Sequence, residues 1–279
     1  MYVWGDALSN YITAMDYEAE GDRFKRYWPC DVHLIGKDIL RFHAGIWIGM
    51  LLSAGVQLPK AVYVHGFITS EGHKMSKSLG NVVDPLEYVD KYGVDALRWF
   101  LMREIPTTDD GDFSHHRFVE VYNSELANGI GNLLNRVVMM VDRYLNGKVP
   151  EVADGRGFSE RLEGFIDDYG DKVGDFDLKA ACEEVVALVD YGNKYIDDKK
   201  PWVMAKEGDK GLGDVLYHLL ELLKVVATLA VPIIPETAQK ICDQIGVELD
   251  DLSLEYKWGG LKKGNAVKKG DALFQRLEE

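Results

Sequence analysis

The chain of 279 residues contains only three cysteines, and Cys30, Cys182 and Cys242 lie far apart with no CxxC pair. This spacing indicates neither a disulfide framework nor a zinc knuckle, and it is typical of a protein from the reducing cytosol. Long apolar runs are also missing. The most apolar run, Val225–Ile234, spans about ten residues and is too short to cross a bilayer. We therefore expect a cytoplasmic protein with no membrane partner.

Basic residues are scarce relative to acidic ones, with 32 Lys and Arg against 46 Asp and Glu and a net charge of −14. Taken alone, this balance argues against a nucleic-acid partner, because phosphate binding needs local positive charge. Proline is scarce too, at 8 residues, whereas 47% of the residues are apolar and 28% are charged. These proportions are typical of a folded globular protein, and the length allows two domains.

The N-terminal part of the chain alternates between strand and helix patterns. Short apolar runs predict strands at 32–35 and 61–66, and apolar residues at helical spacing predict a helix over 39–54 between them. A strand, a helix and a strand in this order form a βαβ unit, so the two strands should be parallel. The run from Met1 to Trp4 is a further strand candidate.

From Phe118 onward the apolar period is helical. Short loops between amphipathic helices predict an antiparallel bundle, so the fold class is α/β followed by all-α. The helices are expected at 118–145, 158–170, 176–198, 201–207, 212–230 and 235–245.

The run from Gly72 to Pro85, GHKMSKSLGNVVDP, carries the strongest chemical signal. Lys74 and Lys77 lie between two glycines, and glycines make a loop mobile enough for two ammonium groups to fold over a polyphosphate. Such charges can stabilise a triphosphate as pyrophosphate leaves. A generic K-x-x-K pair would instead be solvated surface.

The pentapeptide KMSKS after a βα unit resembles the second signature of class I aminoacyl-tRNA synthetases. LGNVVDP also fits the valine and isoleucine enzymes of that class. Two segments, YVWGDALSNY at 2–11 and WPCDVHLIGKDILRFH at 28–43, resemble the methionyl-tRNA synthetase family in particular. The resemblance extends over essentially the whole chain.

This resemblance implies a partial Rossmann-like catalytic domain and a helical-bundle anticodon-binding domain. The expected bounds are 1–104 for the C-terminal half of the catalytic domain with its KMSKS loop, 105–117 for a connector in the stem-contact region, 118–257 for the anticodon-binding domain and 258–279 for a tail. The 7 histidines do not form the HxGH motif of the class. We therefore expect the C-terminal half of the enzyme, without the part that bears HxGH, and no adenylation by this chain alone.

The resemblance also implies a set of residues that contact methionine. A thioether is apolar and polarizable, and aromatic rings offer it sulfur–ring contacts. On spacing alone, the same residues would be core aromatics. The set comprises Trp4, Ala7, Leu8, Tyr11, Ile39 and His43.

Residues after the two strands are implied to bind ATP. Gly36 and Asp38 would contact the ribose, and His65 and Gly66 would lie near the adenine, at the carboxyl ends of strands where ligands bind in open α/β sheets. The same positions fit a turn glycine, a helix N-cap and an ordinary strand end. The loop completes the ATP set with Lys74, Met75, Ser76, Lys77 and Ser78, of which Lys74 and Lys77 are the expected catalytic residues.

Two positions in the helical part match residues that read the CAU anticodon in the family. Asn132 and Arg136 are four residues apart and share one helix face. Trp202 follows Pro201 in a first helical turn and resembles the tryptophan that stacks on an anticodon base. Without the family, Asn132 and Arg136 would belong to a solvated face and Trp202 would be a core anchor.

The function implied by the resemblance is ATP-dependent activation of L-methionine to methionyl-adenylate and its transfer to tRNA(Met). ATP and Mg²⁺ form the substrate complex, and zinc is not expected in this part of the chain. A separate N-terminal half of the enzyme would be a further partner. Two alternatives stay open: a non-catalytic tRNA anticodon-binding module, or a fragment of a valine- or isoleucine-type class I synthetase.

Overall fold

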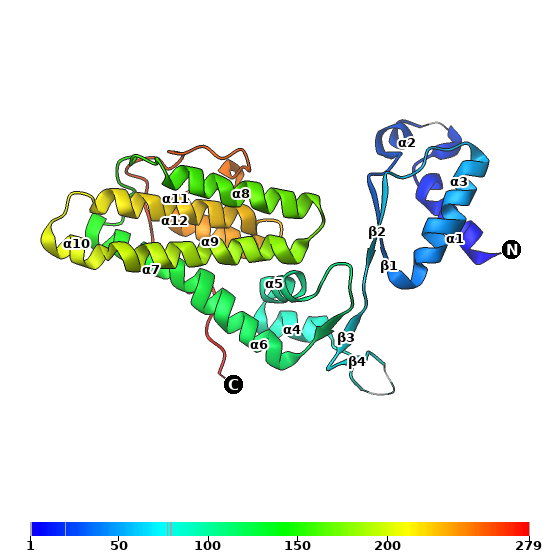
Figure 1. Cartoon of the computed structure of the whole chain (residues 1–279), viewed down its shortest axis with the longest axis horizontal. Helices are drawn as coiled ribbons and strands as arrows, with labels where there is room; N and C mark the ends of the chain where they lie inside the picture. The colour runs from blue at the N-terminus through cyan, green and yellow to red at the C-terminus, as the bar shows by residue number, and fades with distance from the viewer. Residues whose placement is uncertain (1, 20, 77, 79, 279) are drawn as a thin grey trace. The chain divides into compact units, whose positions relative to one another are not determined.

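The computed structural model describes residues 2–19, 21–76, 78 and 80–278 (Figure 1). The chain divides into two compact units. Unit 1 comprises Met1–Thr69 and Thr107–Gly111, and unit 2 comprises Ser70–Pro106 and Asp112–Glu279. Within the described residues, none of the helices combines the length and the apolar character needed to cross a membrane.

Unit 1 contains the predicted βαβ unit. Strands β1 (Val32–Gly36) and β2 (Ala61–His65) are parallel, and Gly36 pairs with His65 at their carboxyl ends. The connection runs through the 3-10 helix η2 (Lys37–Ile39), the π-helix η3 (Phe42–Trp47) and the α-helix α3 (Ile48–Ala54). The parallel pairing is confirmed, and the helix expected over 39–54 is interrupted by a π-helical turn.

The prediction of a strand from Met1 to Trp4 is wrong. Helix α1 (Val3–Thr13) begins there instead, followed by η1 (Tyr17–Ala19) and α2 (Asp22–Tyr27). Leu8 and Ile12 are four residues apart on α1 and are buried with Phe42 and Trp47. This helical spacing of buried residues outweighs the strand propensity of the tyrosine, valine and tryptophan at the start.

A small second sheet has the strand order β4-β3-β5. It is built from β3 (Ile68–Ser70), β4 (His73–Lys74) and β5 (Gly111–Phe113). Glu71 and Gly72 join β3 to β4, both at positive φ, the conformation that a tight two-residue hairpin turn requires. Strand β5 lies in the segment expected to be a connector.

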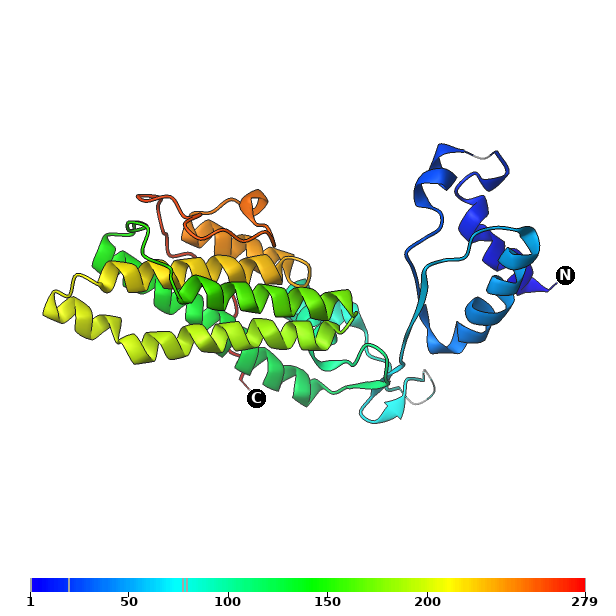
Figure 2. The same cartoon turned by 45° about the horizontal axis from the view of Figure 1, so that its top comes forward.

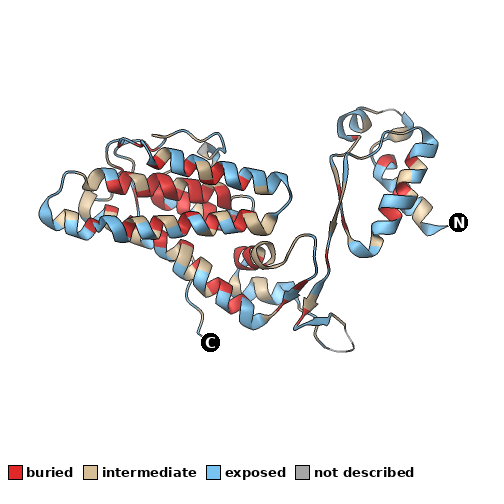
Figure 3. Cartoon of the chain, in the orientation of Figure 1, coloured by how far each residue is buried: buried red, intermediate tan, exposed pale blue. Residues whose placement is uncertain are grey.

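From Phe118 onward the regular elements are helices, which confirms the all-α prediction for this part and with it the fold class, α/β plus all-α. Helix α9 packs against α8, α11 and α7, and α11 packs against α12 (Figure 2). Of the 19 residues of α11, 13 are buried, so it forms the centre of the core (Figure 3). The elements are α4 (Pro85–Tyr92), α5 (Val94–Glu104), α6 (His115–Val121), the π-helix η4 (Tyr122–Gly131), α7 (Asn132–Leu145), α8 (Phe158–Gly174), α9 (Leu178–Lys199), α10 (Pro201–Glu207), α11 (Leu212–Ala230), α12 (Pro235–Ile245) and η5 (Leu249–Asp251).

The last part of the chain, residues 264–277, forms an extended segment that we call the C-terminal strap (red in Figure 1). Backbone hydrogen bonds attach its start to the loop after α7, with Val267 donating to Gly147 O at 2.9 Å. Its end is held by Asn123, whose side-chain amide donates to Leu277 O at 3.0 Å and accepts from Leu277 N at 2.9 Å. The strap is therefore fixed at both ends.

Helix α5 is tied to the bundle through a buried carboxylate. Asp95 is 5% exposed, and its Oδ2 accepts from the backbone N of Thr237 at 2.6 Å and from its Oγ1 at 2.7 Å. Thr237 lies in the first turn of α12, where backbone N–H groups have no partner within the helix. Asp95 therefore caps a helix that is distant in sequence.

Candidate functional site

Apart from Ala7, the residues expected to contact methionine meet on unit 1 around a tyrosine–histidine pair. Tyr11 Oη lies 3.0 Å from His43 Nε2, and His43 Nδ1 lies 3.1 Å from the carbonyl oxygen of Ile39. Because a carbonyl oxygen can only accept, Nδ1 carries the imidazole proton and Nε2 accepts from the tyrosine hydroxyl. This chain of hydrogen bonds fixes the orientation of both rings.

Aromatic rings surround this pair. Trp4 stacks on Phe42 with ring centroids 4.1 Å apart and meets His43 edge-on at 6.3 Å. Leu8 is buried beneath them, whereas Ala7 is exposed on the same helix, α1. The structure thus brings Trp4, Leu8 and His43 together and leaves Ala7 at the surface.

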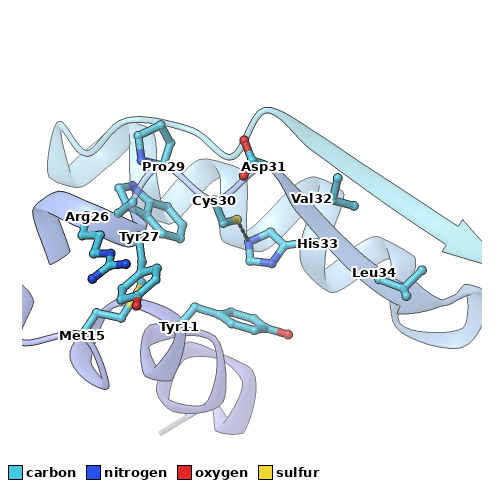
Figure 4. Close-up of a pocket in the computed structure, with 11 residues that line it drawn as sticks. Tyr11, Met15, Arg26, Tyr27, Pro29, Cys30, Asp31, Val32, His33 and Leu34 are labelled. Atoms are coloured by element: carbon cyan, nitrogen blue, oxygen red, sulfur yellow. Dashed lines mark hydrogen bonds between the residues drawn. The ribbon is translucent and has the colours of Figure 1, made fainter. Parts of the chain in front are cut away.

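A cavity of about 600 Å³ lies next to the tyrosine (Figure 4). Its lining includes Tyr11, Met15, Cys30 and His33. His33 Nε2 accepts from the indole N–H of Trp47 at 3.0 Å, and its ring centroid lies 4.5 Å from that of Tyr11. Burial, with a further contribution from His43, lowers the pKa of His33. No role was predicted for His33, which lies on the buried face of β1.

The residues expected to hold the nucleoside part of ATP come together at the carboxyl ends of β1 and β2, as the sequence predicted. A Cβ added to Gly36 would lie 2.8 Å from Asp38 Oδ1 and 3.5 Å from Cε1 of His65. A Cβ on Gly66 would lie 2.0 Å from the carbonyl oxygen of Asp109. Gly66 therefore requires glycine, because a side chain there would meet backbone atoms, and Gly36 leaves an open cradle beside a carboxylate and an imidazole.

Asp110, which was not predicted from the sequence, forms contacts next to the carboxyl ends of β1 and β2. Asp110 forms an ion pair with Lys37, and its Oδ1 accepts from the backbone N of Phe67 at 2.7 Å. The hydrogen bond from Lys37 holds the pKa of Asp110 below its ordinary value. Asp110 lies in the expected connector, more than 70 residues from Lys37 in sequence, so no local pattern links the two.

The KMSKS loop belongs to unit 2, and the side chain of Asn81 bridges it through two hydrogen bonds. The side chain of Asn81 accepts from the backbone N of Ser76 at 2.9 Å and donates to the carbonyl oxygen of Lys74 at 3.2 Å. Ser76 Oγ lies 2.7 Å from Ser78 Oγ. The carboxamide of Asn81 therefore links the end of the loop to its beginning. In the sequence, only its position within LGNVVDP pointed to this residue.

Of the two expected catalytic lysines, the structure describes Lys74. Lys74 ends strand β4 with an exposed side chain, and Met75 is half-buried beside it. Lys77 lies outside the described residues.

The expected anticodon-reading residues lie on two helices of unit 2 that are in contact, α7 and α10. Arg136 on α7 donates from Nη1 to Asn193 Oδ1 at 3.0 Å and from Nη2 to Asp197 Oδ1 at 2.5 Å. Trp202 is 45% exposed, so its interpretation as a core anchor is wrong. Asn132 is exposed at the first residue of α7. Arg136 is held in place rather than freely solvated.

Over the described part of the chain, no three His, Cys, Asp or Glu side chains are grouped so that they could hold a metal ion.

Comparison with known proteins gives matches along the whole chain. Residues 1–138 match the family model for class I tRNA synthetases of the methionyl type, and residues 150–279 match the model for the anticodon binding domain of methionyl tRNA ligase. The methionine–tRNA ligase of Caldanaerobacter subterraneus is 47% identical over 100% of this chain and 45% of its own length. That of Thermotoga maritima is 42% identical, again over 100% of this chain and 45% of its own length.

A solved structure matches over nearly the full chain as well. Mycobacterium tuberculosis methionyl-tRNA synthetase in complex with methionyl-adenylate superposes with a TM-score of 0.89 at 38% identity, over 99% of this chain and 56% of that one. The chain therefore spans about half the length of the proteins it matches.

Proposed function

Because the chain belongs to the methionyl-tRNA synthetase family of class I enzymes, we propose that it forms part of a methionine–tRNA ligase. The ligase activates L-methionine with ATP to methionyl-adenylate and transfers the methionyl group to tRNA(Met), in the cytoplasm. The observation that carries the proposal is the aromatic cluster around Tyr11 and His43, which lies within the two sequence segments typical of the family.

In this proposal the cluster binds the methionine side chain. The stacked rings of Trp4 and Phe42 offer an apolar, polarizable surface that suits a thioether. The Tyr11 hydroxyl donates to His43, so its oxygen is oriented at the edge of that surface and gives it one directional polar group. A branched aliphatic side chain such as leucine would gain less from such a surface.

The nucleoside of ATP is assigned to the edge formed by Gly36, Asp38 and His65. The missing side chain at Gly36 lets a ribose approach the backbone, and the Asp38 carboxylate can accept hydrogen bonds from ribose hydroxyls. Lys74 would supply positive charge to the polyphosphate of the Mg²⁺–ATP substrate as pyrophosphate leaves. Lys77, the second lysine of the same motif, is assigned the same task.

The anticodon is assigned to Asn132, Arg136 and Trp202. A guanidinium has five N–H donors, and the bonds of Arg136 to Asn193 and Asp197 leave others for a base edge. The exposed ring of Trp202 can stack on an unstacked base, an interaction worth about 1–3 kcal/mol.

The net charge of −14 does not argue against an RNA partner, because the net charge of a chain does not determine the local charge at a binding site.

A second candidate is a tRNA-binding module without catalysis. It is favoured by one observation: the 7 histidines of the chain contain no HxGH pair. We propose that this chain alone does not catalyse methionine-dependent ATP–pyrophosphate exchange.

Exchange measured on a chimera tests the proposal. In the chimera, the chain replaces the matching 45% of the Caldanaerobacter ligase. The chimera should catalyse the reaction with methionine but not with valine or isoleucine, and the isolated chain should not. Lys74→Ala in the chimera should abolish exchange, whereas Lys91→Ala, at an exposed lysine of α4, should not. Exchange by the isolated chain, or full activity of Lys74→Ala, would contradict the proposal.

A further inference from the structure

A cavity in unit 2 lies between the helix that carries Asn132 and the C-terminal strap. The proposed function uses Asn132 at its mouth and no other residue of its lining. Its volume is about 460 Å³, which falls in the range of sites for small organic groups. We call it the amide groove. Its lining includes Asn128, Asn132, Asn135, Gln244, Lys269, Asp271 and Phe274.

The asparagines of the groove have unused hydrogen-bonding capacity. Within the residues that the structure describes, the side chains of Asn128, Asn132 and Asn135 are exposed and form no hydrogen bond to the protein. Other asparagines of unit 2 are engaged: Asn193 accepts from Arg136, and Asn265 donates to Gly246 O. Each carboxamide offers two N–H donors and a carbonyl acceptor, so three of them side by side form a donor and acceptor surface.

The walls of the groove are fixed before any ligand binds. Gln244 Nε2 donates to Asp271 O at 3.4 Å, and the backbone N of Lys268 donates to Gln244 O at 2.9 Å. On the other side, Asn128 lies in η4, a π-helix, a rare conformation that is frequently found at functional sites. Preformed walls reduce the entropy that binding must overcome.

The chemistry of the lining fits an uncharged, planar, polar group. Lys269 and Asp271 both line the groove, so their charges offset each other and a phosphate gains little there. Phe274 adds an aromatic face, itself packed at 5.6 Å against Tyr122. Asparagine and glutamine side chains pair in bidentate fashion with the N6 and N7 atoms of adenine, and aromatic side chains stack on bases of any kind.

We propose that the amide groove binds one unstacked base of the anticodon loop outside the anticodon triplet, with adenine preferred. The inference rests on the proposed function, because Asn132 lines the groove and lies one helical turn from Arg136 on the same face. An RNA strand that is read at Arg136 therefore passes the mouth of the groove. The groove extends the contact with tRNA beyond the three anticodon bases.

Fluorescence anisotropy with a labelled anticodon stem-loop RNA tests this. Each loop nucleotide outside the triplet is made abasic in turn, and each RNA is titrated with the parent chain and with Asn128→Ala/Asn135→Ala. One abasic RNA should bind the parent about tenfold more weakly than the intact RNA. The double variant should bind the intact and that abasic RNA equally. Gln239→Ala, a carboxamide on α12 bonded only to Asp243 in the described residues, should behave as the parent.

The outcomes separate this inference from the proposed function. If no stem-loop binds the parent, the proposed function of the helical unit fails and this inference with it. If the RNA binds in a manner that depends on Trp202, but neither the abasic series nor the double variant changes affinity, the inference alone is wrong. A uniform loss of affinity for every RNA would also contradict it. Asn135→Asp, which keeps the side-chain shape and removes the N–H donors, repeats the test should the double variant not fold.

A competition experiment with free adenosine distinguishes a base of the RNA from a free nucleoside as the occupant of the groove. Free adenosine should displace the stem-loop weakly and only from the parent, because its base lacks the contacts of the flanking RNA. Adenosine binding to the parent at the same concentration as the stem-loop would assign the groove to a free nucleoside and overturn the proposal.

Discussion

Nη2 of Arg136 lies 2.5 Å from Oδ1 of Asp197, although the two residues are 61 positions apart in sequence. Asn193 holds the neighbouring nitrogen at 3.0 Å, so two residues of α9 orient one guanidinium on α7. A guanidinium group whose orientation is already fixed loses less conformational entropy when it binds a base edge. This arrangement explains why an arginine, and not any cation, occupies the position.

Arg136→Lys should therefore weaken binding of a CAU stem-loop about tenfold or more, because an ammonium group cannot keep both contacts and present a planar donor pair. The measurement is the dissociation constant by anisotropy. Arg143→Lys, at an exposed arginine on the same helix, is the control and should bind as the parent does. Equal effects of the two substitutions would remove the special role of Arg136.

Trp202→Ala should lower RNA affinity by about 1–3 kcal/mol, the range for loss of one base–aromatic stack. Since the ring is 45% exposed, the melting temperature should hardly change. Trp202→Phe should retain most of the affinity, and Val203→Ala, at the exposed neighbouring position, should have no effect. A large fall in stability with unchanged RNA binding would make Trp202 a structural residue after all.

His218 should give the bundle a pH-dependent stability. Burial lowers its pKa below the ordinary 6.5, against the opposing influence of the Asp154 carbonyl and the Asp214 carboxylate and with a smaller lowering from Lys199. Its Nε2 donates to Asp154 O at 3.1 Å, so its Nδ1 accepts from the hydroxyl of Tyr195 at 2.7 Å and the folded state requires the neutral ring.

A histidine with a lowered folded-state pKa contributes its full stabilisation above the unfolded-state value and loses it as the pH falls through about 6.5. Urea unfolding at pH 7.5, 6.5 and 5.5 measures this. His218→Gln should be less stable than the parent at pH 7.5, and the difference should shrink toward pH 5.5. A constant difference across that range would contradict the assignment.

Asp95→Ala should destabilise unit 2 by about 1–3 kcal/mol, because it leaves the buried N–H and hydroxyl of Thr237 without an acceptor. Differential scanning calorimetry should show a lower melting temperature. Asp95→Asn, which keeps one acceptor oxygen, should fall between the parent and Asp95→Ala. Asp90→Ala, at an exposed aspartate of α4, should leave the melting temperature unchanged, and a similar shift in both would exclude a capping role.

Much of the fold followed from local patterns. The parallel pairing of β1 and β2 and the helices from residue 118 onward were predicted correctly, whereas α4 and α5 were not predicted. A hydrophobic period sustained over many residues determines which face is buried. The meeting of Gly36, Asp38 and His65 was also predictable, since parallel strands bring their carboxyl ends to one edge. Helix α1 was missed because its first residues favour strands until they are packed.

The rest of the candidate site could not be read from the sequence, because it depends on contacts between distant segments. Asp110 reaches Lys37, and Asp197 reaches Arg136, only after the chain has folded. The π-helical backbone of η4 leaves the apolar pattern nearly unchanged, so the predicted helix over 118–145 contained no sign of it. The amide groove exists only because the C-terminal strap, which has no periodicity, returns over α7.

The most direct test of the account is the affinity of this chain for two stem-loop RNAs that differ only in the anticodon, one with CAU and one with GAU. We predict that the CAU stem-loop binds about tenfold or more tightly, as one well-read base difference allows, and that Trp202→Ala removes most of the binding of both. Equal affinity for the two RNAs, or no binding of either, would contradict the claim that the helical unit reads the methionine anticodon.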